Sequence, residues 1–329
     1  MTSLRLSMVL GLLLVLAAGL SLFCGQAPIG PGSIARWLAG DQSLDVLILS
    51  EIRLPRLVLG LVVGAGLGGA GAVLQGFLRN PLADPGVIGV SASAGFGAVL
   101  SLYFGVSGLF ALALPLAGIA GAAAGVILLF MMAGSGASAT TLILSGVAVN
   151  ALAGALTALL MNLAPNPWAL SEIAYWLMGS LKDASWNEVL FAAPLILAGL
   201  LVLMSTSGAL NALSLGEAAA RSLGVDLSRL RGAVVLGTAL AVGGGVAVAG
   251  AIGFVGLVVP HILRPLIGHQ PGALVVPSML GGSLLLVVAD MAVRLLSGPG
   301  VPLYLGVLTA LIGAPFFLWL VRTSQRIAP

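Results

Sequence analysis

The chain has 329 residues, of which 60% are hydrophobic and 7% are charged, and its mean hydropathy is +1.19. Because soluble globular domains carry about 25% charged residues, this composition excludes that class and predicts an all-α polytopic membrane protein with a single transmembrane domain over residues 1–329. The net charge of +3 is too thinly spread for a nucleic-acid surface, so no nucleic-acid partner is expected.

Apolar stretches along the chain predict about ten transmembrane helices. Residues 85–171 contain no Asp, Glu, Lys, Arg or His. As one helix they would extend about 130 Å against a hydrocarbon core of about 30 Å, so they must fold back into three spans. The predicted spans are 6–24, 54–76, 87–105, 108–133, 140–162, 189–206, 232–249, 251–266, 273–296 and 304–322.

The first stretch has two interpretations. Arg5 and the apolar run after it, followed by small residues around Gly25, also fit a cleaved signal peptide. We expect a retained first span instead. Cys24 is the only cysteine, so no intrachain disulfide is possible, and we expect it to pack against its neighbours.

The cut inside residues 232–266 is not defined by hydropathy, because glycines punctuate one continuous apolar run. Two spans there make the total even, which places both termini on the same side of the membrane, and we therefore predict two. With ten spans and both termini in the cytoplasm, eight of the thirteen basic residues lie inside, in agreement with the positive-inside rule. These eight are Arg5, Arg79, Arg221, Arg229, Arg231, Arg264, Arg322 and Arg326.

Small residues dominate the second predicted span, with glycines at 60, 64, 66, 68, 69, 71 and 76. Small residues let helix backbones approach closely in lipid, so this span is expected to pack against other helices. Pro81, Pro85 and Gly86 then predict a tight cytoplasmic turn.

The fifth predicted span carries Asn150, an amide that is costly in lipid unless it is paired or faces a wet cavity. It is either a hydrogen-bonding contact between helices or a pathway residue. The small, hydroxylated loop 135–141 before it suits a constriction that opens and closes, although a plain turn explains it almost as well. Between Pro165 and Trp186, clustered Trp and Tyr residues predict a partial helix at the outer membrane interface.

Three arginines flank spans on the predicted outer side, against the positive-inside rule: Arg53, Arg56 and Arg294. Each alone could extend its side chain to the interface. Together they favour a docking surface for acidic side chains of a partner.

Residues 211–231 form the longest polar interruption of the chain; we call this stretch the coupling segment. Ser214 and Glu217 have the spacing of a capping box, which predicts a short helix ending at Gly224. Asp226 offers a second N-cap, so two short helices at the membrane surface, joined by a glycine hinge, are predicted. A solvated loop is the alternative, but about twenty residues with their own caps are typical of a functional loop.

The sequence carries no catalytic constellation. Lys182, the sole lysine, is not in a nucleotide-binding motif, so the chain is not expected to hydrolyse ATP. His261 and His269 lack further ligands nearby, and we expect neither a metal site nor a cofactor.

Five stretches of the chain are distinctive: RLPR (53–56), RNPLADPGVIGVSASAG (79–95), GEAAARSLGV (216–225), AGAIGFVGLVVPHILR (249–264) and IGAPFFLWL (312–320). Together they resemble the FecCD family of permeases of binding-protein-dependent ABC importers. They occur in the family's order and cover nearly the whole chain.

The resemblance implies ten spans per subunit in the bacterial inner membrane, and a homodimer with its pathway on the two-fold axis. It also implies two cytoplasmic ATPase subunits and a periplasmic substrate-binding protein. The ATPase contact would be made by Gly216, Glu217, Ala220, Arg221, Leu223 and Gly224. Arg53, Arg56 and Arg294 would meet the binding protein, and a cytoplasmic gate would comprise Ser138, Ala139, Thr140 and Thr141.

The cargo implied by the resemblance is heme, moved by alternating access, because spans three to five carry no charge and the NPLADPG stretch looks most like the heme importers. A ferric siderophore is the alternative. Ala139 replaces a hydroxylated residue expected in cobalamin importers, so cobalamin is less favoured. A secondary transporter or channel without ATP would need an ionisable relay inside the membrane, and the deep positions show none.

Overall fold

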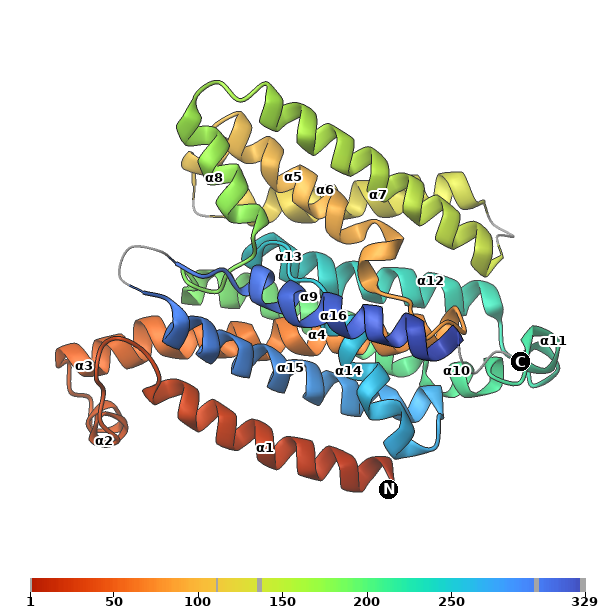
Figure 1. The fold of residues 1–329 in the computed structure, drawn as a ribbon, viewed down its shortest axis with the longest axis horizontal. Coiled ribbons are helices and arrows are strands. Elements are labelled where there is room, and N and C mark those ends of the chain that lie inside the picture. The colour runs from red at the N-terminus through yellow and green to blue at the C-terminus, as the bar shows by residue number, and fades with distance from the viewer. Residues whose placement is uncertain (1, 111, 135–137, 299–301, 326–329) are drawn as a thin grey trace.

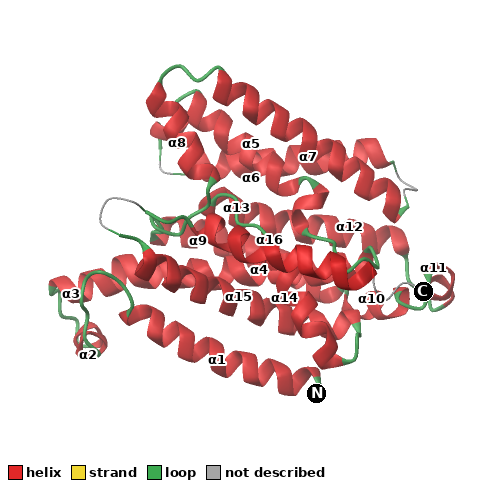
Figure 2. Ribbon diagram, viewed as in Figure 1, coloured by secondary structure: helices red, strands yellow, loops and turns green. Residues whose placement is uncertain are grey.

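The computed structural model describes residues 2–110, 112–134, 138–298 and 302–325. In these ranges the secondary structure is helical, with loops between the helices (Figure 2). The α-helices are α1 (Ser3–Phe23), α2 (Gly32–Leu38), α3 (Leu44–Leu47), α4 (Leu54–Phe77), α5 (Val90–Tyr103), α6 (Ala113–Ala133), α7 (Ala139–Asn162), α8 (Pro167–Leu177), α9 (Trp186–Ser205), α10 (Ser207–Leu213), α11 (Glu217–Ser222), α12 (Leu227–Thr238), α13 (Gly244–Ala249), α14 (Val255–Leu263), α15 (Pro271–Leu296) and α16 (Leu305–Gln325). The predicted all-α fold class is confirmed.

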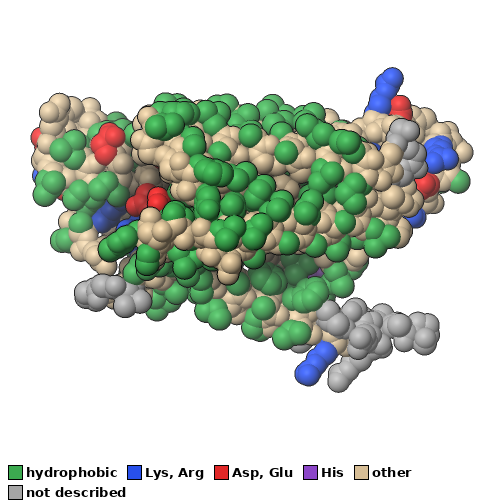
Figure 3. Space-filling model, turned by 90° about the horizontal axis from the view of Figure 1, so that it is seen from above, with side chains coloured by type: hydrophobic (Ala, Val, Ile, Leu, Met, Phe, Trp, Pro, Cys, Tyr) green, Lys and Arg blue, Asp and Glu red, His purple; other side chains and the backbone are tan. Residues whose placement is uncertain are grey.

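Long helices run side by side along the molecule, and short helices gather at its two ends (Figure 1). One end holds α2, α3 and α8, and the other holds α10, α11 and the start of α1. Charged side chains lie mainly at these ends, while the surface between them is largely hydrophobic (Figure 3). This is the surface of a protein that spans a bilayer, with polar ends in water and an apolar belt in lipid.

Seven helical segments within the described ranges are long and apolar enough to cross a membrane, by length and composition. They are Ser3–Phe23, Leu44–Phe77, Ala113–Ala133, Thr140–Asn162, Trp186–Ser205, Leu227–Ala249 and Pro271–Leu296. Three more apolar helices are shorter: Val90–Tyr103, Val255–Ile267 and Leu305–Leu318. The count of ten therefore stays a prediction, since it depends on whether the three shorter helices also cross.

The predicted close packing of the second span is found in α4, whose apolar window is 78% buried. Gly68 lies so close to α15 that a Cβ there would overlap the carbonyl oxygen of Ser278. Gly71 meets the backbone of Gly256 on α14 in the same way. The glycines of α4 therefore allow direct backbone contact with two neighbouring helices, as expected for packing in lipid.

The apolar run at 232–266 is broken, as the two-span prediction requires. Helix α12 continues through the π-helical turn η4 (Ala239–Gly243) into α13, which stops at Ala249. Gly250 has φ +68°, and Phe254, the residue before α14, has φ +67°. A phenylalanine in this left-handed conformation costs on the order of 1–3 kcal/mol, so its surroundings must hold it there. Phe254 packs against Gly313 of α16, so closely that a Cβ at Gly313 would overlap the Phe254 side chain.

Candidate functional site

The coupling segment begins in the last turn of α10, contains the short helix α11 and ends in the first turns of α12, so its helices differ from the predicted pair. The capping box prediction is wrong: Ser214 extends the end of α10, and its hydroxyl donates to the carbonyl oxygen of Asn211 at 2.7 Å. Helix α11 instead begins after Gly216, whose φ of +104° favours glycine. Gly224, at φ +83°, follows the end of α11 as predicted.

Asp226 is an N-cap, as predicted, because Oδ1 accepts from the backbone N–H groups of Ser228 and Arg229 at 2.9 and 3.1 Å. These hydrogen bonds stabilise the carboxylate and lower the pKa of Asp226. The helix that it caps is not a second short surface helix. It is α12, which begins the long apolar segment Leu227–Ala249.

Helix α11 is anchored by one side and exposed on the other. Ala220 is fully buried in the main core, whereas Glu217 and Arg221 are exposed and form an i,i+4 ion pair at 3.7 Å. Leu215 and Leu223, just before and just after α11, are also exposed. A short helix with a charged pair between two exposed leucines can contact a protein through both polar and apolar groups.

At the opposite end, the structure brings Arg53, Arg56 and Arg294 together; we call them the arginine cluster. Their guanidinium groups make contacts within the chain. Arg53, which is 5% exposed, donates to the carbonyl oxygens of Leu22 and Ala27 at the end of α1. Arg294 donates to the carbonyl oxygens of Ser21 and Cys24 at 2.9 and 2.8 Å.

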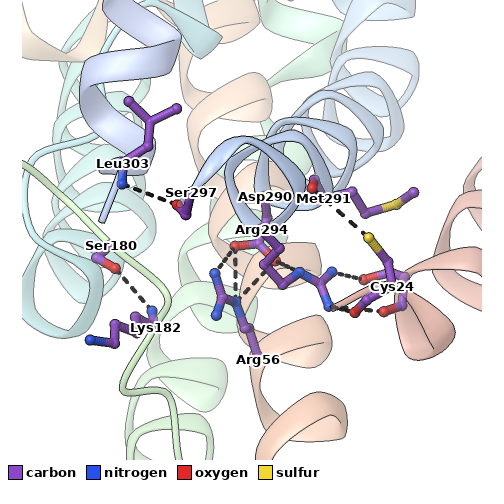
Figure 4. A network of polar contacts seen from close by, with 10 residues as sticks. Cys24, Arg56, Ser180, Lys182, Asp290, Met291, Arg294, Ser297 and Leu303 are labelled. Carbon is purple, nitrogen blue, oxygen red and sulfur yellow. Dashed lines mark hydrogen bonds and ion pairs between the residues drawn. The ribbon is translucent and has the colours of Figure 1, made fainter. Parts of the chain in front are cut away.

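Asp290 on α15 is the centre of this network (Figure 4). Arg56 approaches it with Nη2 at 2.7 Å and Nε at 3.0 Å from its carboxylate, and the Nε of Arg294 lies 3.1 Å away. The side chains of Arg56, Asp290 and Arg294 are 12%, 5% and 10% exposed. This is a nearly buried ion-pair network that ties α1, α4 and α15 together.

Asp290 was missed as a site residue by the sequence analysis, which placed Arg294 on the same helix. Their i,i+4 spacing is the signal that identifies the pair, since residues four apart lie on the same helix face. Its second partner, Arg56, is 234 positions away, and no local pattern indicates that contact.

A cavity of about 560 Å³ adjoins the arginine cluster. Its described lining holds four cationic side chains, Arg53, Arg56, Arg294 and Lys182, and no acidic one. Lys182 lies on the neighbouring loop beside Ser180, whose Oγ accepts from its backbone N–H at 3.0 Å (Figure 4). Asp290 and Asp183 lie near this cavity but do not line it, so the cationic lining favours anions.

The predicted interfacial helix at 165–186 is present as α8. Its Tyr175 stacks on Tyr304, which precedes α16, with ring centroids 5.7 Å apart and planes 8° from parallel. The pair joins α8 to the residue just before α16, beside the cavity at the arginine cluster, which Tyr304 also lines.

The predicted gate residues lie at the start of α7. Ser138 is the N-cap, and its Oγ accepts from the backbone N–H of Thr141 at 3.2 Å. Thr140 is exposed. Residues 135–137 and the side chain of Ala139 lie outside what the structure describes, so the gate stays a prediction.

Asn150 is exposed on α7, and no hydrogen bond of its amide is present within the described chain. It therefore does not act as a contact between helices of one subunit. The exposed face beside it includes Val147, Ala151 and Ala158. No group of three or more His, Cys, Asp or Glu in the described ranges is placed to hold a metal ion.

The chain matches the model of the FecCD transport family over residues 12–323. It is 37% identical to the hemin transport system permease protein HmuU of Yersinia pestis over 97% of this chain and 96% of that protein. It is 40% identical to the Fe(3+) dicitrate permease FecD of Escherichia coli K12 over 96% and 98% of the two chains. For the vitamin B12 permease BtuC of Vibrio cholerae, the identity is 41% over 85% and 84%.

A solved structure described as an inward-facing metal-chelate type ABC transporter is similar throughout. It has a TM-score of 0.85 and 36% identity, and the match covers 98% of this chain and 99% of the other. The three relatives are nearly equal in identity although their cargoes differ.

Proposed function

The chain belongs to the FecCD transport family, as predicted, and is a permease of the ABC importer type; we propose that it moves heme across the bacterial inner membrane by alternating access. Both termini would lie in the cytoplasm. Two copies would form the pathway between them, two separate ATPase subunits would supply the energy, and a periplasmic binding protein would deliver the cargo.

The exposed polar residue Asn150 on α7 carries the proposal that two copies form the pathway between them. An unpaired amide that faces lipid is costly, so Asn150 is expected to face either water or a second polypeptide. A homodimer with α7 beside the central pathway meets that need. Thr140 and Thr141 would then lie at the cytoplasmic end of the same helix, where the gate is expected.

The geometry of the coupling segment supports the proposal that a separate ATPase subunit drives transport. Ala220 fixes α11 to the core, so a force applied to the exposed Glu217, Arg221 and Leu223 is transmitted to α10 and α12. Gly216 and Gly224 set the angle of α11 at either side. We propose this surface as the contact with the ATPase subunit.

The arginine cluster is proposed to guide the binding protein. Because the guanidinium groups are engaged inside the chain, they act through the positive potential of the cavity, to which the ammonium group of Lys182 also contributes. Acidic side chains of the binding protein would approach this end and lower the repulsion among the four cations.

Heme is preferred as cargo because charged side chains are absent from residues 85–171, which include three apolar helices, so a flat, largely apolar molecule can pass them. A ferric siderophore is the second candidate, since the relatives include a ferric dicitrate permease.

Uptake into liposomes that hold the assembled complex tests the cargo, with heme, ferric siderophores and cobalamin compared side by side. The proposal predicts accumulation of heme above the other two. Accumulation of cobalamin alone would overturn the heme assignment while leaving the permease role intact.

A further inference from the structure

A second cavity, of about 580 Å³, lies between α5, α6 and α7, away from the arginine cluster and the coupling segment. We call it the α5–α7 groove. It is lined by Phe96 and Leu100 of α5, by Phe104 just after α5, and by residues of α6 and α7. Small residues of α6, such as Ala120 and Ala124, keep the groove open.

The chemistry of the groove is almost purely hydrocarbon. Its described lining contains no charged side chain and only two hydroxyl groups, those of Ser93 and Ser101. An apolar space of this kind does not hold water well, because water needs several polar partners. An apolar ligand is the expected occupant.

The length of the groove fits one leaflet of a bilayer. The lining residues on α5 and at its C-cap run from Ser93 to Phe104, which is about 17 Å along a helix at about 1.5 Å per residue. Half of a hydrocarbon core of about 30 Å is about 15 Å. The groove therefore extends about as far as one acyl chain of a membrane lipid.

Of the two hydroxyl groups in the groove, that of Ser101 lies nearer the C-terminal end of α5. Ser101 is 4% exposed, its Oγ has no hydrogen-bond partner, and it lines the groove. It lies two residues before Tyr103, where α5 ends and where the Tyr103 hydroxyl donates to the carbonyl oxygen of Leu163 at 3.1 Å. Tyrosines at helix ends are typical of the bilayer interface, the depth at which the ester carbonyls of phospholipids lie.

We propose that the α5–α7 groove binds one acyl chain of a phospholipid, with the Ser101 hydroxyl donating a hydrogen bond to the ester carbonyl of that chain. The lipid is a bound structural ligand and not the cargo. The groove uses Val149, Leu152, Ala153 and Leu156 of α7, which recur at i, i+3, i+4 and i+7 on one face of the helix. Val147, Ala151 and Ala158 lie on the opposite face, so a subunit partner there leaves the groove free.

The test uses the full chain in liposomes that contain phosphatidylcholine with a photoreactive group in its acyl chain, followed by mass-spectrometric mapping of labelled peptides. Label should concentrate on α5, α6 and α7 relative to the lipid-facing side of α1. Ala124→Phe places a ring in the groove and should lower that labelling about tenfold, because the space is filled. Ala123→Phe, one position along α6 and outside the groove, should leave it unchanged.

Ser101 is tested separately with a matched ether-linked lipid, which lacks the ester carbonyl. The wild-type groove should be labelled more strongly by the ester lipid than by the ether lipid, and Ser101→Ala should remove that difference. This comparison decides the proposal even if Ala124→Phe does not fold. Equal labelling of the groove and α1, equal labelling by both lipids in the wild type, or a second copy cross-linked in the groove would each overturn it. None of these readouts depends on transport.

Discussion

Asp290 is the residue on which the arginine cluster depends, because its single carboxylate contacts both Arg56 and Arg294. In Asp290→Asn, two nearly buried guanidinium groups lose their counter-charge. Removing one partner of a buried ion pair typically costs about 3–5 kcal/mol, so the variant should unfold at a clearly lower temperature. Thermal unfolding of the purified protein in detergent measures this.

The matched control is Glu51→Gln, which neutralises an exposed carboxylate two residues before Arg53 of the arginine cluster. It should unfold at the temperature of the wild type, since exposed charges contribute little. If Asp290→Asn were as stable as this control, the network would not hold α1, α4 and α15 together.

Part of the arginine cluster could be predicted from the sequence. The charge pattern identified all three arginines as unusual, and the structure brings them together. The charge pattern could not indicate that the guanidinium groups face inward. The partners of Arg53, for example, are the backbone carbonyls of Leu22 and Ala27, and a backbone carbonyl has no sequence signature. Whether a binding protein docks at this end stays a prediction.

Among the helices, α4 shows how a sequence pattern specifies packing. Its small residues predicted close contact, and Gly68 lies directly against the backbone of Ser278. In Gly68→Ala, the added methyl group forces α4 and α15 apart, which should sharply reduce the yield of folded protein. Size-exclusion chromatography after detergent extraction gives that yield.

Gly11→Ala is the control, since a Cβ at Gly11 of α1 meets nothing within 4 Å. In a helix this change should be neutral or stabilising by about 1 kcal/mol. Equal yields from both variants would contradict close packing at Gly68.

The coupling segment shows where local patterns fail. Ser214 and Glu217 have the spacing of a capping box, but α10 runs through Leu213, so Ser214 is held in the turn of the preceding helix and its hydroxyl bonds to Asn211. A four-residue motif cannot report a helix that comes before it. Asp226 was predicted correctly because its cap depends only on the two residues that follow it closely.

If α11 is the contact with the ATPase subunit, its exposed charged pair should be needed for assembly. Glu217→Ala combined with Arg221→Ala should abolish copurification of the ATPase subunit without reducing the yield of the permease, because both side chains are exposed. Arg229→Ala, at an exposed ion pair outside α11, should retain the ATPase. Copurification that survives the double substitution would remove α11 from the coupling role.

At the scale of the whole molecule, the chain has the composition, helical fold and family of an importer permease, with a polar segment at one end and a cationic cavity at the other. The family could be predicted from five stretches because each is long and they occur in order. The number of crossings could not, since hydropathy does not decide whether helices of 13 or 14 residues, such as Val255–Ile267 and Val90–Tyr103, traverse the bilayer.

If this permease moves cargo only when a nucleotide-hydrolysing subunit acts on its coupling segment, transport must depend on both that subunit and ATP. The most direct measurement is heme accumulation in liposomes that contain the permease and binding protein, with and without the ATPase subunit and ATP. Heme should accumulate only when both the ATPase subunit and ATP are present. Heme accumulation by the permease without the ATPase subunit would rule out this dependence.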